Sequence, residues 1–396
     1  MSSKTDIPEV QAKYDFADLL IAGVTGLMLA YSVLFLCVLP LIGTLAGGRD
    51  FVVYWATGHQ LAHHANPYDT DAMMRIEQGA GLSSQYKVGF MRNPPWSLIL
   101  ALPLGFIGLR IAALLWSSIL LACLTLSVRM LWQMHNRPKN CLHWLGISFT
   151  PALLCVSMGQ TSVFALLGFV LFLRLHRSQP TLAGMSLWLC ALKPHLFLAF
   201  GAVLLAWVLV SRSYKILAGA ALSIAASAGA VFCVAPGAWS QYAQMMRTYG
   251  IESEPIPCLS IELRQWLNPH AMWLQYLPAG LACGWALGYF WRRRQTWDWI
   301  RDGNLVMLVS IITAPYSWIF DESLAIPALL QGAYLSGSRL LLAILAVVSV
   351  LIEIELVCGL KLFSNYYLWT APAWLAWYLL ATGIKRTQVG TIETNQ

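Results

Sequence analysis

Charged residues are scarce in this chain. They make up 11% of its 396 residues, whereas soluble domains carry about 25%. Hydrophobic residues account for 58%, and the mean hydropathy is +0.62. This balance excludes an ordinary soluble domain and predicts an all-α polytopic membrane protein, because a segment in lipid must satisfy its backbone polar groups internally. The 18 tryptophans and 15 tyrosines fit the aromatic belts of membrane interfaces.

Other patterns are missing too. The nine cysteines form no CxxC pair and most fall in apolar runs, so we interpret them as structural thiols. There is no glycine-rich phosphate loop, and we therefore expect no nucleotide site. No internal repeat is evident, although transporters are commonly built from two similar halves. The net charge of +7 is typical of cytoplasmic loops and does not indicate nucleic-acid binding.

The apolar runs predict about twelve membrane-spanning helices with both chain ends in the cytoplasm. Residues 1–16 form the N-terminal tail, 17–383 the transmembrane domain and 384–396 the C-terminal tail. Most of the 25 lysines and arginines then lie inside, as the positive-inside rule requires. The expected spans are 17–41, 109–134, 141–158, 161–175, 181–192, 196–211, 215–235, 270–291, 303–317, 322–335, 339–360 and 366–383.

Three segments outside these spans have distinct predictions. The first external loop, 42–93, contains two short helices that we expect to lie on the membrane surface, the second capped by Asp69. Residues 94–108 carry three prolines and are shorter than the roughly 20 residues that a spanning helix needs. We predict that they re-enter the outer leaflet, with two short spans as the alternative. The second external loop, 236–269, is long enough to cover a site.

Polar side chains cluster at five places on the predicted outer side. Polar groups at membrane depth face a cavity or one another, so we expect these clusters to meet in one outward-facing pocket. The clusters are GRD (48–50), RNPPW (92–96), MGQTS (158–162), LKPH (192–195) and APYSWIFDE (314–322).

The succession DFxVYWxxGxxLxxxxNPYD, NPPW, GQTS, LKP and APYSW resembles glycosyltransferase family 87, over roughly residues 45–325. The resemblance implies an integral-membrane enzyme with a GT-C-type helical bundle, which takes a sugar from a polyprenyl-phosphate carrier. It also implies that Asp50 is the catalytic base, that Asn93-Pro94-Pro95 matches a YPP-type element, and that residues 314–318 with Asp321 match an SPxSW element. Mannosyltransferase-like members carry histidines where this chain has Ile319 and Phe320, so the sugar and the acceptor stay open.

Sugar transfer from a lipid phosphate requires a base and cations. Asp50 would remove the proton as the acceptor hydroxyl attacks the anomeric carbon from the opposite face, which predicts inversion. The departing phosphate needs positive partners in a poorly solvated site. The candidates for phosphate binding are Arg49, Arg92, Lys193, His195, Arg247 and Arg264; those for sugar stacking are Tyr54, Trp55 and Trp96; and the other substrate-binding candidates are Asn93, Gln160, Trp318 and Asp321.

Each choice has a structural alternative. Asp50 could be the N-cap of the helix that follows it. Lys193 could extend to the membrane interface, and Gln160 could bond a neighbouring helix. Asp321 and Glu322 could cap the helix that they open.

We therefore predict a hexosyltransferase that moves a hexose, with mannose as the candidate, to a glycan or glycolipid hydroxyl on the outer face of the cell inner membrane. The predicted partners are the polyprenyl-phosphate-sugar donor, the acceptor and membrane lipid, with no nucleic acid and no cofactor. His59 and His63 share one helix face but offer only two ligands, where zinc sites use three or four, so we expect no metal. The alternative function is a polytopic transporter or flippase.

Overall fold

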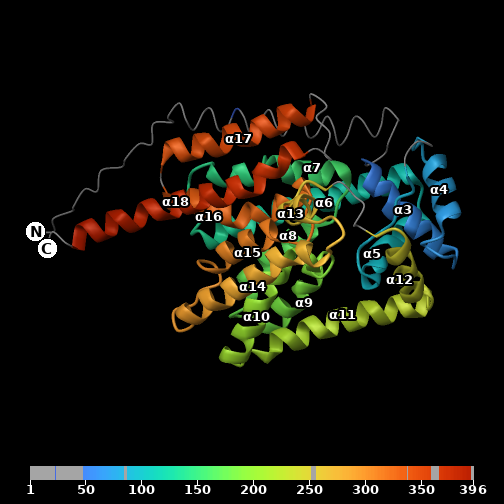
Figure 1. The fold of residues 1–396 in the computed structure, drawn as a ribbon, viewed down its shortest axis with the longest axis horizontal. Helices are drawn as coiled ribbons and strands as arrows, with labels where there is room; N and C mark the ends of the chain where they lie inside the picture. Colours follow the sequence, from blue (N-terminus) through green and yellow to red (C-terminus); the bar gives the residue numbers. More distant parts are fainter. Residues whose placement is uncertain are drawn as a thin grey trace, which may run out of the picture.

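The computed structural model describes residue 23 and residues 48–83, 87–250, 256–336, 338–357 and 365–393. Every regular element within these ranges is a helix (Figure 1), which confirms the all-α prediction for this part of the chain. The predicted tail 1–16 and, apart from Gly23, the predicted first span 17–41 lie outside the described residues.

Two short helices occupy the predicted first external loop. They are α3 (Gly48–Ala62) and α4 (Thr70–Gly79). Asp69 is the N-cap of α4, as predicted, and its carboxylate accepts the backbone N–H of Ala72 at 2.8 Å. Asp50 is not an N-cap, because α3 already includes the two residues before it.

Helix α3 is buried over most of its circumference. Phe51, Val52 and Ala56 are fully buried. Gln60 is also buried, and its amide donates to the carbonyl of Asn66 at 3.1 Å, whereas His63 and His64 just after the end of the helix are exposed. The prediction that α3 lies along the membrane surface stays a prediction; the structure adds that the helix also packs against protein on most of its sides.

The segment after Arg92 packs directly on α3 through glycine. Its three helical turns are η2 (Pro95–Ser97), α5 (Leu98–Ala101) and η3 (Leu102–Phe106). A Cβ atom on Gly58 would lie 2.1 Å from the carbonyl oxygen of Ala101, and one on Gly105 would lie 2.0 Å from that of Gly58. The two backbones therefore touch, and only glycine fits at both positions.

Replacing Gly58 by alanine should loosen this contact. We expect Gly58→Ala to lower the free energy of unfolding by about 3 kcal/mol, at the upper end for overpacking, because the clashing atom is backbone. Thermal unfolding in detergent measures the effect. Gly79→Ala is the matched control, since a Cβ atom there meets nothing within 4 Å. Equal melting temperatures for the two variants would contradict the prediction.

The structure does not confirm the predicted count of about twelve spans. Within the described residues, three helices are long and apolar enough to cross a membrane: α6 (Leu109–Met134), the run Pro194–Ser211 formed by η5 (Pro194–Phe197) and α10 (Leu198–Ser211), and α11 (Tyr214–Val234). Other apolar helices reach 10 to 14 residues, short of the roughly 20 required. These are α8 (Ser162–Leu175), α9 (Pro180–Cys190) and α15 (Gly303–Ile312).

The predicted span 141–158 is also interrupted. It is divided into η4 (Leu142–Gly146) and α7 (Thr150–Met158). Pro151 lies in the first turn of α7. Proline is favoured there because its missing N–H would have no partner within the helix, so it marks the start of a new helix.

Helices α9 and α11 form a second close backbone contact. A Cβ atom on Gly184 would lie 2.0 Å from the carbonyl oxygen of Ile216, and one on Gly219 would lie 2.1 Å from that of Thr181. Small residues at helix–helix interfaces allow this approach in membrane proteins, where packing drives association. The contact holds the helix that ends just before Lys193 against the rest of the bundle.

The predicted second external loop folds onto the first. It contains α12 (Ala238–Thr248) and α13 (Leu259–Leu267). The Tyr242 ring lies 5.8 Å from that of Tyr68, and Trp239 lies 6.1 Å from Trp96. Helices α3, α4, α5 and α12 thus gather at one end of the molecule (Figure 1).

The rest of the chain completes the bundle. Helix α18 runs past residue 383, where the sequence placed the end of the last span, and it ends at the side of the molecule opposite α3 and α4 (Figure 1). The elements are α14 (Trp273–Arg293), η7 (Ile319–Ala325), α16 (Ile326–Ser336), α17 (Arg339–Val357), η8 (Asn365–Trp369) and α18 (Thr370–Glu393).

Asp302 organises the loop between α14 and α15. Its carboxylate accepts from Arg293 at 2.5 Å, from Arg301 at 2.8 Å and from the backbone N–H of Asp298 at 3.2 Å. Burial opposes ionisation, but the bonds from Arg301, the Asp298 N–H and Arg293 outweigh it and place the pKa of Asp302 below its usual value.

Asp302→Asn should therefore destabilise the protein in a pH-dependent way. A depressed folded pKa contributes stability above the unfolded pKa of about 3.9, and this is lost as the pH falls through the folded value. We expect a loss of about 1–3 kcal/mol at pH 7, and a smaller one below pH 4. Melting curves at pH 7 and pH 3 test this, and an equal difference at both pH values would contradict it.

Candidate active site

A continuous chain of hydrogen bonds links four of the five polar clusters. The Gln160 amide nitrogen donates to Asp50 Oδ2 at 2.8 Å. Lys193 Nζ donates to Gln160 Oε1 at 3.0 Å and to Asp321 Oδ1 at 2.7 Å. The structure thus places side chains from GRD, MGQTS, LKPH and APYSWIFDE in direct contact.

The corner between α7 and α8 presents Gln160. Gly159 ends α7 with a φ of +74°, a left-handed conformation that glycine adopts without strain. Its carbonyl accepts the indole N–H of Trp116 at 2.8 Å. The chain therefore turns sharply, and Gln160 emerges just before the first turn of α8.

Lys193 and Asp321 are placed by their local sequences. Pro194 keeps Lys193 out of the helical region, with a φ of −135° and a ψ of 66°, so the chain turns between the end of α9 at Cys190 and the start of η5. Asp321 lies in η7, where its second oxygen accepts the backbone N–H of Trp318 at 2.9 Å. Asp321 therefore has the capping role that the sequence offered as an alternative, and it also forms the ion pair with Lys193.

The Lys193–Asp321 ion pair is buried. The Asp321 side chain is 1% exposed and that of Lys193 is 10% exposed. Ser162 donates its hydroxyl to Asp321 Oδ1 at 2.5 Å, and Lys193 Nζ lies 4.8 Å from the centre of the Phe320 ring. Charges removed from water to this extent are stabilised only when bonded on several sides, as here.

Asp50 stands at the accessible end of the chain of hydrogen bonds. It is partly exposed, in contrast to the buried Asp321. Tyr54, one turn further along α3, is buried and donates its hydroxyl to Gln160 Oε1 at 3.2 Å. The pKa of Tyr54 is raised well above its usual value, mainly by burial and to a smaller extent by the charge of Asp50, so its hydroxyl stays protonated.

The fifth cluster, RNPPW, adjoins the chain through Asn93 and Trp96. The buried Asn93 amide donates to the Thr161 hydroxyl at 3.3 Å and to the Leu192 carbonyl at 2.9 Å. The Trp96 indole donates to the Ala191 carbonyl at 3.1 Å. These bonds fasten the Pro95–Phe106 segment to the residues that flank Gln160 and Lys193.

Arg92 and His195 lie among tyrosines. The Arg92 carbonyl accepts the Tyr242 hydroxyl at 3.1 Å, and its guanidinium interacts electrostatically with Tyr242 and Tyr316. His195 stacks on Tyr316, with ring centres 3.7 Å apart. Burial raises the pKa of Tyr242, while Arg92 partly offsets that shift.

Other predicted candidates lie elsewhere. The Trp55 indole donates to the Ile107 carbonyl at 3.0 Å, and the Arg264 guanidinium contacts the turn into α14 through the Pro269 carbonyl at 3.4 Å. Arg247 is exposed near the end of α12. The Arg49 side chain lies outside the described residues.

The comparison with known families now bears on this geometry. The family model of glycosyltransferase family 87 matches residues 90–315, more than half of the chain. The chain belongs to glycosyltransferase family 87. It is therefore a transferase that uses a donor and an acceptor substrate, and the three long apolar helices among the described residues indicate a membrane protein. No curated protein and no solved structure matches it. Gln160 and Lys193 lie within the matched residues, whereas Asp50 and Asp321 lie outside them.

Sequence reasoning missed several polar groups of this family 87 chain. Ser162 and Tyr316 lie inside the GQTS and APYSW motifs, which could have indicated them. Nothing in the sequence indicates the partners of the buried Glu322. Its carboxylate accepts the Thr370 hydroxyl at 2.5 Å and the Trp374 indole N–H at 2.7 Å, which ties η7 to α18.

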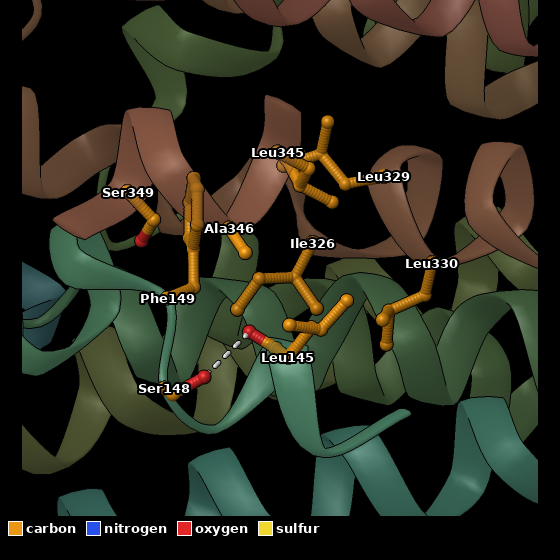
Figure 2. Close-up of a pocket in the computed structure, with 10 residues that line it drawn as sticks. Leu145, Ser148, Phe149, Ile326, Leu329, Leu330, Leu345, Ala346 and Ser349 are labelled. Carbon is orange, nitrogen blue, oxygen red and sulfur yellow. Dashed lines mark hydrogen bonds between the residues drawn. The ribbon is translucent and has the colours of Figure 1, made fainter. Parts of the chain in front are cut away.

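An apolar cavity lies apart from the polar chain. It opens between η4, α16 and α17, and Ser148 and Ser349 are the polar side chains among the residues that line it (Figure 2). The residues that line it include no titratable side chain. Within the described ranges, no three histidine, cysteine, aspartate or glutamate side chains gather where a metal ion could bind.

Proposed function

We propose that this family 87 glycosyltransferase moves a hexose, with mannose as the candidate, from a polyprenyl-phosphate carrier to an acceptor hydroxyl, with inversion. The observation that carries the proposal is the hydrogen-bonded chain from Asp50 through Gln160 to Lys193 and Asp321. It provides a partly exposed carboxylate and a buried ammonium within one connected site, the two groups that transfer from a lipid phosphate requires.

Asp50 is the proposed general base. The hydrogen-bonded chain contains two carboxylates, Asp50 and Asp321. Asp321 is 1% exposed and is bonded to Lys193, Ser162 and the Trp318 N–H, so the acceptor substrate cannot reach it. Asp50 is partly exposed. A base must come within hydrogen-bond reach of the proton that it removes, and this geometric condition favours Asp50.

Arg92 is the proposed direct partner of the carrier phosphate, and Lys193 is proposed to stabilise the phosphate charge through space, since its three N–H donors are engaged by the protein. Lys193 Nζ is held by Gln160, Ser162 and Asp321, which fixes its charge in a poorly solvated place. A preorganised cation stabilises the charge that develops on the leaving phosphate more strongly than a mobile one. His195 follows Lys193 by two residues and is stacked on Tyr316.

The sugar is expected against half-buried aromatic rings. Tyr54 is buried and its hydroxyl is engaged by Gln160, so we no longer assign it a stacking role. Trp96 and Trp318 are only partly buried. We assign the proposed stacking surface to these two tryptophans.

The test is a transfer assay with a defined donor. Membranes that contain the protein are incubated with a radiolabelled polyprenyl-phosphate hexose, and a second set receives the matching nucleotide sugar. We expect labelled glycan or glycolipid from the lipid-linked donor alone. Right-side-out and inverted bacterial inner-membrane vesicles test the proposed outer-face site, and NMR of the new glycosidic bond tests inversion. Movement of the lipid-linked sugar across the membrane without transfer would contradict the proposal and favour a flippase.

A further inference from the structure

The side-chain amide of Gln160 stands between a carboxylate and two donors. Its oxygen accepts from Lys193 Nζ at 3.0 Å and from the Tyr54 hydroxyl at 3.2 Å. Its nitrogen donates to Asp50 Oδ2 at 2.8 Å. All three neighbours thus bond to one small group.

These neighbours leave the amide only one orientation. An ammonium group can only donate and an ionised carboxylate can only accept, whereas the Tyr54 hydroxyl can do either. The amide oxygen must therefore face Lys193 and the NH₂ group must face Asp50. A flipped amide would oppose donor to donor at Lys193 and acceptor to acceptor at Asp50.

The backbone of Gln160 is also fixed. Its N–H donates to the Cys155 carbonyl at 2.9 Å, and its own carbonyl accepts the Cys155 thiol at 3.2 Å. The preceding Gly159 carbonyl is bonded to Trp116. A side chain with this support is positioned well enough to orient another group.

We propose that Gln160 is a positioning residue that holds the Asp50 carboxylate ionised and correctly oriented and couples it to the Lys193 ammonium. This inference rests on the proposed function, in which Asp50 is the base. A hydrogen bond to the charged form of an acid favours that form. The bond from Gln160 therefore keeps Asp50 ionised and able to accept a proton. The oxygen of the same amide accepts a hydrogen bond from Lys193, the cation proposed to stabilise the carrier phosphate.

Few other titratable groups among the described residues lie where they could affect the protonation of Asp50. Tyr54 from α3 and Cys155 from α7 lie in the site, as do Lys193 and Asp321. On the other elements packed against α3, Asp71 and Arg75 of α4 and Arg110 of α6 are exposed, and Glu77 accepts the backbone N–H of Gly89. The Gln160 amide is the described uncharged group that touches both Asp50 and Lys193.

The substitution Gln160→Glu provides the test. Lys193 would keep the new carboxylate ionised, with one oxygen facing Asp50, and like charges at this separation disfavour ionisation. Infrared difference spectra between the full chain and its Asp50→Asn variant report protonation of Asp50 without any substrate. We expect Gln160→Glu to raise the midpoint of this titration by roughly 1–3 pH units.

The acidic limb of the pH–activity profile should move by the same amount. Gln244→Glu is the matched control, since it adds the same charge on an exposed face of α12 and should leave both curves in place. Gln160→Met, which keeps the length and loses the donor, should raise the midpoint by about one pH unit and lower kcat with little change in KM.

Two outcomes separate the inference from the proposed function. An unchanged titration midpoint in folded Gln160→Glu and Gln160→Met would overturn the positioning role, even if both variants lost activity. A shifted midpoint in a protein that transfers no sugar from the lipid-linked donor would support the positioning of Asp50 and reject the proposed donor instead.

Discussion

Asp50→Asn should lower the rate of sugar transfer by about 10²- to 10⁴-fold, the usual contribution of a general base. The amide is almost isosteric with the carboxylate but cannot take a proton from the acceptor hydroxyl. Its oxygen can still accept the Gln160 bond, which measures 2.8 Å in the structure, so the amount of folded protein should not fall. Initial rates with the labelled lipid-linked donor, normalised to the folded fraction by size-exclusion chromatography, measure the effect.

The control for this prediction is an acid on the neighbouring helix. Asp71 is exposed in the first turn of α4, so Asp71→Asn removes the same charge from the same region without touching the chain of hydrogen bonds. We expect less than a twofold change in rate, because solvent and salt screen the charge of an exposed side chain. Asp50→Asn activity within tenfold of the native rate would remove Asp50 as the base.

Lys193→Met should destabilise the protein by about 3–5 kcal/mol, because it leaves the buried Asp321 without its cation. Methionine fills similar space, so the loss is electrostatic and not a cavity. The pair measures 2.7 Å and the Asp321 side chain is 1% exposed. Chemical or thermal unfolding in detergent gives the change in free energy, and transfer should be lost as well, since the cation proposed to stabilise the phosphate charge is gone.

A double variant separates the ion pair from other effects. Adding Asp321→Asn to Lys193→Met removes the unpaired charge, so the double variant should be more stable than Lys193→Met alone and still inactive. Arg177→Met breaks the pair with Asp298, also 2.7 Å long but exposed by 70% and 31% at its two side chains, and should cost less than about 1 kcal/mol. Equal losses for the buried and exposed pairs would contradict this account.

The contact between the polar clusters could be predicted because polar side chains are costly in lipid and are stabilised when they bond to one another. Gln160, Lys193 and Asp321 stand in connections between apolar segments, where an unpaired polar group is costly, so their mutual contact follows from composition and order along the chain. The family resemblance then singled out Asp50. The same reasoning did not anticipate the structural partners of Trp55 and Arg264, which donate to the carbonyls of Ile107 and Pro269.

The packing of α3 could not be predicted. A helical stripe indicates which face is apolar, but not whether the other face meets protein or water, and Gln60 is buried through its bond to Asn66. Helix ends were missed for a related reason. The break between η4 and α7, and the early end of α15 at Ile312 instead of residue 317, depend on tertiary contacts that hydropathy alone does not report.

The ion pair that closes the site joins residues 128 positions apart. At a synthesis rate of about 5–20 residues per second, the ribosome makes Lys193 roughly 6–25 seconds before Asp321. During that interval the lysine has to stay hydrated or be sheltered by the insertion machinery, since burial without its carboxylate is unfavourable. The pairing of Lys193 with Asp321 therefore has to follow translation of η7.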